Sequence, residues 1–154
     1  MKKTLLTLLL ACAVAFPAGD PVSFHIWKAG DIAAKGKELA KKLDSFKSAN
    51  ETVDTIGNRT FMVAHREGNG RAEWHERQAD IIMIENGSAT EVYGGEVVGG
   101  KTTAPGEIRG DSIKGGTETA LGQGDVLHIP AKVAHMMKVA PGKTVTYFVV
   151  KVVE

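Results

Sequence analysis

The segment GDVLHIPAKVAH, residues 124–135, contains the features that decide the fold. Its first six residues are predicted to form a β-strand, Pro130 marks a turn, and a second strand is predicted to begin at His135. Alternate residues of a strand face the same side, so His135 shares a face with Met137 and Val139. The segment therefore predicts a histidine at the mouth of an apolar strand face.

A second stretch, EWH at residues 73–75, also places polar side chains on one face of a predicted strand. In a strand, Glu73 and His75 share one face, while Trp74 takes the other and needs cover from the N-terminal helix or another subunit. Asp80 shares a face with the isoleucines two and four residues later, which makes it the polar end of an apolar stripe. A carboxylate in such a position is costly unless it is paired or coordinated.

Short β-rich runs alternate with glycine-bearing turns from residue 55 onward. Many short strands with regular turns predict an all-β sandwich or barrel, and a closed barrel leaves no exposed edges. The segment 101–122 is glycine-rich and weakly periodic, so we expect a long connection there, with a short strand at 107–113. The other strands are predicted at residues 60–66, 80–84, 89–93, 124–129, 135–139 and 144–152.

Together the two stretches resemble the two motifs of the cupin family. Residues 124–135 spell G-x5-P-x-K-x2-H, which is the family's second motif, G-x5-P-x-G-x2-H, with Lys132 in place of a glycine. The first stretch spells E-x-H-x4-D-x6-G and ends at Gly87, where the family has H-x-H, a Glu three or four residues later and a Gly after six more. The resemblance covers residues 52–154 and implies a cupin-type double-stranded β-helix, a jelly-roll barrel, which commonly forms a homodimer.

The resemblance also implies a metal site to which both stretches contribute. His75 and His135 would supply imidazoles, Asp80 and Glu73 would supply carboxylates, and other coordination positions would stay open to water or substrate. Such a set suits a divalent metal ion, Fe(II), Mn(II) or Ni(II), with Zn(II) as an alternative. Asp80 is a methylene shorter than the family's Glu and could reach the metal through water. Glu73 could instead orient His75 as a hydrogen-bond acceptor, or be the catalytic group that moves a proton.

Other polar residues near the motifs have simpler interpretations. Arg66, Arg109 and Lys132 are able to reach a substrate oxygen, but ordinary surface placement is the simpler expectation for each. His128 is expected to pack or to contact substrate rather than to bind metal, and His65 is expected to be structural. We expect an apolar cavity lined by the inward residues of the same strands, namely Phe61, Val63, Ile82, Ile84, Met137 and Tyr147.

Residues 1–18 are predicted to be a signal peptide. They have a basic start, an apolar run too short to span a bilayer, and small residues before a cleavage point near Ala15 or Ala18. Cys12 follows Leu-Leu-Ala and faintly resembles the lipid-attachment site of bacterial lipoproteins, which is the alternative outcome. If Cys12 is removed, the mature protein has no thiol and depends on packing for stability. We therefore expect a periplasmic or secreted protein.

Residues 19–51 are predicted to hold a linker and one N-terminal amphipathic helix. Asp31 is the expected N-cap, residues 48–50 are expected to close the segment, and residues 52–154 form the barrel. The apolar face of the helix recurs at spacings of three and four residues and consists of Ile32, Gly36, Leu39, Leu43 and Phe46.

Composition limits the choice of partner. The chain is 43% hydrophobic and 24% charged, as expected for a single domain with a core. Loss of Lys2 and Lys3 with the signal peptide would reduce the 19 basic residues to 17, against 18 acidic ones, which argues against nucleic acid. We therefore expect an exported metal-dependent cupin that acts on a small organic molecule as a dioxygenase, isomerase, decarboxylase or lyase. The alternatives are a non-catalytic small-molecule or metal-binding cupin, and a barrel that serves only for dimerisation.

Overall fold

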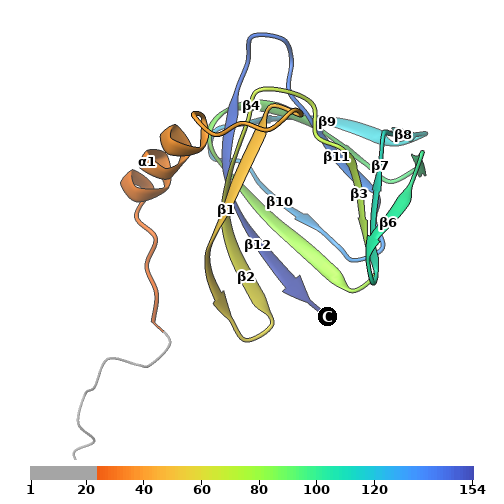
Figure 1. Cartoon of the computed structure of the whole chain (residues 1–154), viewed down its shortest axis with the longest axis horizontal. Coiled ribbons are helices and arrows are strands. Elements are labelled where there is room, and N and C mark those ends of the chain that lie inside the picture. Colours follow the sequence, from red (N-terminus) through yellow and green to blue (C-terminus); the bar gives the residue numbers. More distant parts are fainter. Residues whose placement is uncertain (1–23) are drawn as a thin grey trace, which may run out of the picture.

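Most of the chain forms one curled antiparallel sheet (Figure 1). The computed structural model describes residues 24–154, so the predicted signal peptide and Cys12 lie outside the described residues. Within this range one helix, α1 (Ala29–Leu39), precedes twelve strands. In chain order the strands are β1 (Ser48–Ile56), β2 (Arg59–Arg66), β3 (Ala72–His75), β4 (Gln78–Tyr93), β5 (Glu96–Val98), β6 (Lys101–Ala104), β7 (Glu107–Gly110), β8 (Ser112–Lys114), β9 (Thr117–Gly122), β10 (Val126–Ile129), β11 (His135–Lys138) and β12 (Val145–Val153).

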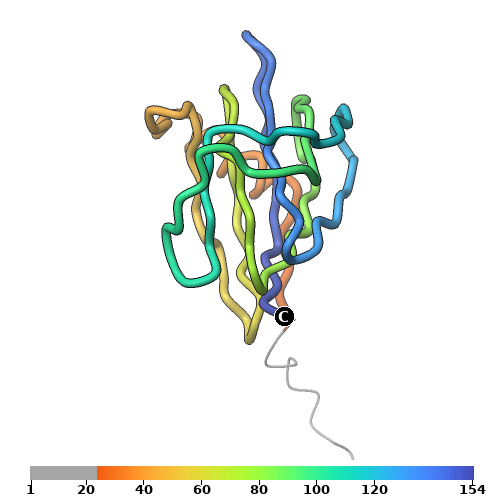
Figure 2. The backbone as a smooth tube through the Cα atoms, turned by 90° about the vertical axis from the view of Figure 1, so that its right-hand side faces the viewer, coloured from red at the N-terminus to blue at the C-terminus, as the bar shows by residue number. Residues whose placement is uncertain are grey.

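The predicted all-β architecture with one N-terminal helix is confirmed. Ten strands belong to a single sheet with the order β1-β2-β12-β4-β11-β3-β7-β6, while β9 and β10 also pair with β4 and β5 pairs with β8. The loop from β11 to β12 projects from one end of the barrel, and the C-terminus lies at the other end (Figures 1 and 2). The long connection expected at residues 101–122 is wrong, because this segment contains β6, β7, β8 and β9. The short strand expected within it at 107–113 corresponds to β7 and the start of β8.

β4 contributes to both walls of the barrel because it bends near its middle. Its first half pairs with β12 and β10, and its second half pairs with β9 and β11. At the bend the register against β12 shifts, and Gly87 adopts a φ of 85°, where a Cβ would collide with the carbonyl oxygen of Thr144. The strands predicted at 80–84 and 89–93 are therefore two halves of one bent strand.

The two faces of β2 pack against different parts of the molecule. Met62 and Ala64 face the barrel interior, whereas Phe61 and Val63 face outward and pack with Phe148 beneath α1. The expectation that Phe61 and Val63 line the cavity is wrong. Both faces of this strand are apolar because both are covered, so hydrophobicity alone does not fix which face points inward.

The helix α1 lies on the outside of the barrel against β2 and β12 (Figure 1). Ile32, Gly36 and Leu39 are buried there, and a Cβ on Gly36 would lie 2.6 Å from Thr146 Cγ2. The helix ends at Leu39, before the predicted end of its apolar face, and Phe46 is exposed. Within residues 24–154, no helix has the length and apolar character needed to cross a membrane.

Two local predictions for this region are wrong. The N-cap position is Lys28 rather than Asp31, and no side-chain cap is made. Residues 48–50 begin β1 instead of closing the helix. Residues 48–50 form a strand because β1 pairs with β2 along most of the length of β1. This pairing gives their backbone N–H and C=O groups hydrogen-bond partners, which the end of a helix would lack.

Candidate metal centre

The four polar side chains singled out in the two motifs come together inside the barrel. Glu73 and His75 lie on β3, Asp80 on β4 and His135 on β11, and one ligand atom from each lies within 4.8 Å of the others. His75 Nε2 is 3.5 Å from Glu73 Oε2 and 3.7 Å from Asp80 Oδ2. His135 Nε2 is also 3.7 Å from Asp80 Oδ2. We call these four residues the polar cluster.

The turn between β10 and β11 fixes how the two motifs meet. The backbone N–H of Lys132 donates a hydrogen bond to the carbonyl of His75 at 2.7 Å, and His135 is paired with Glu73 across β11 and β3. Lys132 has a φ of 66°, the left-handed conformation that favours glycine, which is the family's residue at this position. Lys132 thus adopts a backbone conformation that favours glycine, and the turn docks the second motif onto the first.

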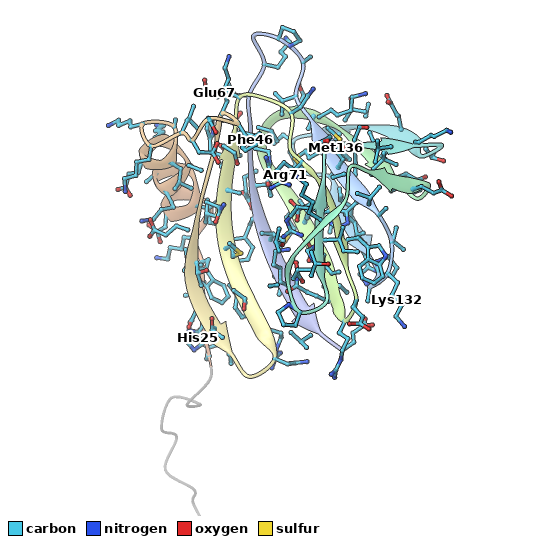
Figure 3. The ribbon with its side chains drawn as sticks, turned by 45° about the vertical axis from the view of Figure 1, so that its right-hand side comes forward. His25, Phe46, Glu67, Arg71, Lys132 and Met136 are labelled. Atoms are coloured by element: carbon cyan, nitrogen blue, oxygen red, sulfur yellow. The ribbon has the colours of Figure 1, made fainter. Side chains whose placement is uncertain are left out.

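Trp74 is half-buried and contacts this same turn, not the helix. Its indole Nε1 donates to the carbonyl oxygen of Lys132 at 3.0 Å. Lys132 lies on the side of the barrel away from α1 (Figure 3). Trp74 points outward as the strand alternation predicts, and its polar atom is satisfied within the chain.

Both histidines are oriented by hydrogen bonds at Nδ1. His75 Nδ1 lies 2.6 Å from Glu107 Oε2, and His135 Nδ1 lies 3.0 Å from the carbonyl oxygen of Val133. Each bond directs Nε2 into the cluster, an arrangement typical of metal-binding histidines. Glu107 was not predicted as a site residue, because its approach to His75 depends on the pairing of β7 with β3, and the sequence predicted only a short strand at 107–113.

Glu73 is held between two arginines. Its Oε2 is 3.2 Å from Arg109 Nη2, and its Oε1 is 3.8 Å from Arg66 Nη2. Burial raises the pKa of Glu73, but His75 and Arg109 outweigh burial and lower it to about 2. Glu73 is therefore a carboxylate at neutral pH and a weak base.

Lys151 is a member of the site that the sequence analysis missed. Its Nζ donates a hydrogen bond to Asp80 Oδ2 at 2.7 Å and lies 3.5 Å from His75 Nε2. Lys151 lies on β12 two residues after Val149 and four after Tyr147, so all three share the face that lines the cavity. The alternation of side chains along this strand was therefore the sequence signal for the position of Lys151.

The charges in the cluster shift one another's protonation. Burial lowers the pKa of His75, but interactions with Asp80 and Glu73 outweigh burial and raise it to about 9. Burial raises the pKa of Asp80, but interactions with His135, His75 and Lys151 hold it well below its usual value. Without a metal, His75 therefore carries a proton at neutral pH, and a metal ion would displace that proton on binding.

The donor atoms fit a divalent ion. Neighbouring ligands of a metal with bonds near 2.1 Å lie about 3.0 Å apart in an octahedron and about 3.4 Å apart in a tetrahedron. Three of the contacts, at 3.5–3.7 Å, are slightly wider than this, and all the ligand atoms lie within 4.8 Å of one another, so the side chains would have to move closer together around an ion. Two imidazoles and two carboxylates form a mixed nitrogen and oxygen set without thiolate, which suits Fe(II), Mn(II), Ni(II) or Zn(II).

Lys151 is expected to weaken metal binding, because its ammonium repels a divalent cation and competes for Asp80. We predict that Lys151→Met tightens the binding of Mn(II) or Zn(II) about tenfold or more, equivalent to about 1.4 kcal/mol. Competition titration with a chelator measures this affinity. Lys143→Met, on the exposed β11–β12 loop, is the matched control. Unchanged or weaker metal binding by the Lys151→Met protein would contradict the competition.

A cavity of about 270 Å³ adjoins the cluster. Ile82 and Tyr147 line it as predicted, with Met62, Ala64 and Val149 as the other apolar lining. It is more polar than the expected apolar cavity. Its further charged residues are Arg66, Glu91, Arg109 and Lys151.

Glu91 is a further residue that the sequence analysis missed, after Glu107 and Lys151. It lies on β4, is 2% exposed, and neither carboxyl oxygen has a hydrogen-bond partner among the described residues. Burial is the main cause that raises its pKa to about 7. Glu91 lies two residues after Ala89, which is buried, on a predicted strand, so the alternation of side chains was the sequence signal that Glu91 faces inward. Buried polar groups without partners are rare and indicate a function or a ligand.

The other polar residues near the motifs differ in whether they line the cavity. Surface placement is wrong for Arg66 and Arg109, which line the cavity, and Lys132 lies outside that cavity. His128 is exposed on β10 and is not part of the cluster. His65 faces away from the cavity and hydrogen-bonds to Thr146 Oγ1 at 2.8 Å.

Comparison with solved structures identifies the architecture. A cupin-2 domain protein of Rhodospirillum rubrum superposes with a TM-score of 0.51 at 12% identity, over 70% of this chain and 61% of that one. This chain has the cupin fold. The fold predicted from the two motifs is thereby confirmed.

Two further structural neighbours have names that refer to enzymes. A putative mannose-6-phosphate isomerase of Ralstonia eutropha JMP134 has a TM-score of 0.51 at 14% identity, over 73% of this chain and 90% of that one. The polyketide cyclase RemF of Streptomyces resistomycificus has a TM-score of 0.50 at 17% identity, over 70% of this chain and 66% of that one. The chain thus spans less than two thirds of the length of some of these proteins. No protein-family model and no curated protein matches the sequence.

Proposed function

We propose that the protein is a metal-dependent cupin that acts on a small organic molecule. The observation that carries this proposal is the convergence of two Nε2 atoms and two carboxylates beside a cavity of about 270 Å³. That volume lies just below the usual range for ligand pockets, which favours a small substrate. The isomerase and cyclase neighbours are consistent with small-molecule chemistry on this fold.

His75, His135, Asp80 and Glu73 would hold the metal. When bound, the metal would supply a Lewis acid that polarises an oxygen of the substrate. Glu107 and the Val133 carbonyl keep the two imidazoles aimed inward, so the chain's contribution is a site built before the metal arrives.

Proton transfer suits Glu91 better than Glu73. A general base or acid works best when its pKa lies near the working pH, and Glu91, with a pKa of about 7, meets that condition. Glu73, with a pKa of about 2, is too weak a base and is engaged by Arg109. Both line the same cavity, so a bound molecule could contact Glu91 while an oxygen faces the cluster.

The proposal is tested by metal analysis of the chain purified without chelator. We expect about one divalent ion per chain, restored after dialysis against chelator by one of Fe(II), Mn(II), Ni(II) or Zn(II), with a rise in the melting temperature on reloading. Retention of no metal and no response of the melting temperature to any of the four ions would overturn the proposal. Turnover of phenols, diketones or sugar acids by the loaded protein would separate an enzyme from a binding protein.

Export and dimer formation belong to the same proposal. The basic and apolar start of the chain supports export to the periplasm or beyond, where the metal would be acquired. The resemblance to cupins supports a homodimer. Mass spectrometry of the mature N-terminus and sedimentation of the purified protein test these two points.

A further inference from the structure

We propose that the cavity binds a small organic acid, whose carboxylate is held by Arg66 and Tyr147. This inference rests on the proposed function, since it names the class of molecule that would occupy the cavity beside the metal. It is carried by the arrangement of cations around the cavity and by the one cation among them, Arg66, that has no acid within hydrogen-bonding distance.

The three cations of the site differ in how they are paired. Arg109 donates to Glu107 Oε2 at 3.1 Å and to the Ile108 carbonyl at 3.3 Å, and its Nη2 lies 3.2 Å from Glu73. Lys151 is hydrogen-bonded to Asp80 at 2.7 Å. Both cations are therefore occupied by acids of the chain itself.

Arg66 is in a different position. Its Nε donates to the Tyr147 hydroxyl at 2.9 Å, and within residues 24–154 the nearest carboxylate to its Nη2 is Glu73 Oε1 at 3.8 Å, beyond hydrogen-bonding distance. Its side chain is only 13% exposed, and it lines the cavity. A shielded guanidinium with undirected terminal N–H groups is suited to bind a carboxylate through two parallel hydrogen bonds.

Tyr147 adds a second donor at the same place. Its oxygen accepts the bond from Arg66 Nε, so its own O–H is directed elsewhere, and Tyr147 also lines the cavity. The hydrogen bond fixes the guanidinium, which lowers the ordering cost when an anion binds. Gly70 supports the other side of Arg66, because a Cβ there would lie 3.1 Å from Arg66 Nη1.

The charge balance of the site also favours an anion. Arg66, Arg109 and Lys151 oppose the carboxylates of Glu73, Asp80 and Glu107, so the charges of these six side chains sum to zero once a metal ion has displaced the proton of His75. A divalent ion would leave an excess of two positive charges in a shielded site, and ionisation of Glu91 would remove only one. An anionic ligand offsets this excess, whereas a neutral ligand does not.

The rest of the cavity wall fits the carbon frame of such an acid. Met62, Ala64, Ile82 and Val149 line the cavity and supply an apolar surface. The ligand class is therefore a small acid with an apolar body, whose carboxylate faces Arg66 and which carries a second oxygen for the metal.

The test uses matched acids and amides on the metal-loaded protein. The probes are 3-hydroxybutyrate, 3-hydroxybenzoate and succinate, each beside its uncharged amide, with binding measured by titration calorimetry. We expect the wild type to bind at least one acid about tenfold or more tightly than its amide. Arg66→Met should weaken that acid about 10- to 100-fold and the amide less than about threefold, as for the loss of a charge-assisted hydrogen bond.

Two variants keep this test decisive. Arg59→Met, at the exposed start of the same strand, should leave acid binding unchanged. Arg66→Lys retains the positive charge but loses the planar guanidinium that can make two parallel hydrogen bonds. Its affinity for the acid should lie between those of the wild type and Arg66→Met, which separates a loss of recognition from misfolding. Equal binding of acid and amide, failure of every acid to bind, or unchanged acid binding in Arg66→Met would overturn the inference. Metal content, measured on the same samples, reports separately on the proposed function.

Discussion

Removal of either histidine of the polar cluster should abolish stable metal binding. We expect His75→Ala and His135→Ala each to weaken the metal about 100- to 1,000-fold. A binding free energy of about 10–16 kcal/mol for a four-ligand site corresponds to about 2.5–4 kcal/mol per ligand. The affinity is measured by chelator competition, and circular dichroism checks that the barrel is still folded. Both substitutions remove a buried imidazole, so a loss of stability is expected beside the loss of metal.

His128→Ala provides the matched control for these two variants. His128 is exposed on β10, in the same motif as His135, and is not part of the cluster. Its replacement should change the metal affinity less than about threefold. If the proteins lacking His75 or His135 retain the metal as well as the His128→Ala protein does, the metal lies elsewhere and the cluster is a charge network alone.

The cluster was predictable because strand alternation and motif spacing constrain it strongly. Glu73 and His75 share a face in any strand that contains both, and Asp80 begins the apolar stripe of Ile82 and Ile84. The turn before His135 was also readable, even though Lys132 replaces the usual glycine. Local geometry gave the face that each residue takes, whereas the meeting of these faces at one site was implied by the resemblance to cupins.

The rest of the site depends on pairings between distant strands. Lys151 reaches Asp80 only because β12 lies beside β4, and Glu107 reaches His75 only because β7 lies beside β3. The inward direction of Arg66 could not be predicted either, since both faces of β2 are apolar. Strand order and the covering helix decide these contacts, and neither leaves a periodic signal in the sequence.

Glu91 should make the metal-free protein less stable as the pH rises. Its pKa is raised from 4.5 to about 7, mainly by burial, so the folded state prefers the protonated form. The associated stability is fully present below pH 4.5 and is lost as the pH rises through about 7. Glu91→Gln has no such proton to lose. We expect the variant to gain roughly 2–3 kcal/mol of unfolding free energy relative to the wild type between pH 5 and pH 9.

Urea denaturation of chelator-treated protein at the two pH values measures this difference. Glu96→Gln removes an exposed carboxylate and should follow the wild type within about 0.5 kcal/mol at both pH values. Parallel loss of stability by Glu91→Gln and the wild type would show that Glu91 is already ionised, or hydrated, in the folded state. If the stabilities of Glu91→Gln and the wild type instead diverge as expected, Glu91 gains and loses its proton near pH 7 inside the cavity. A proton-transfer role for Glu91 requires this property.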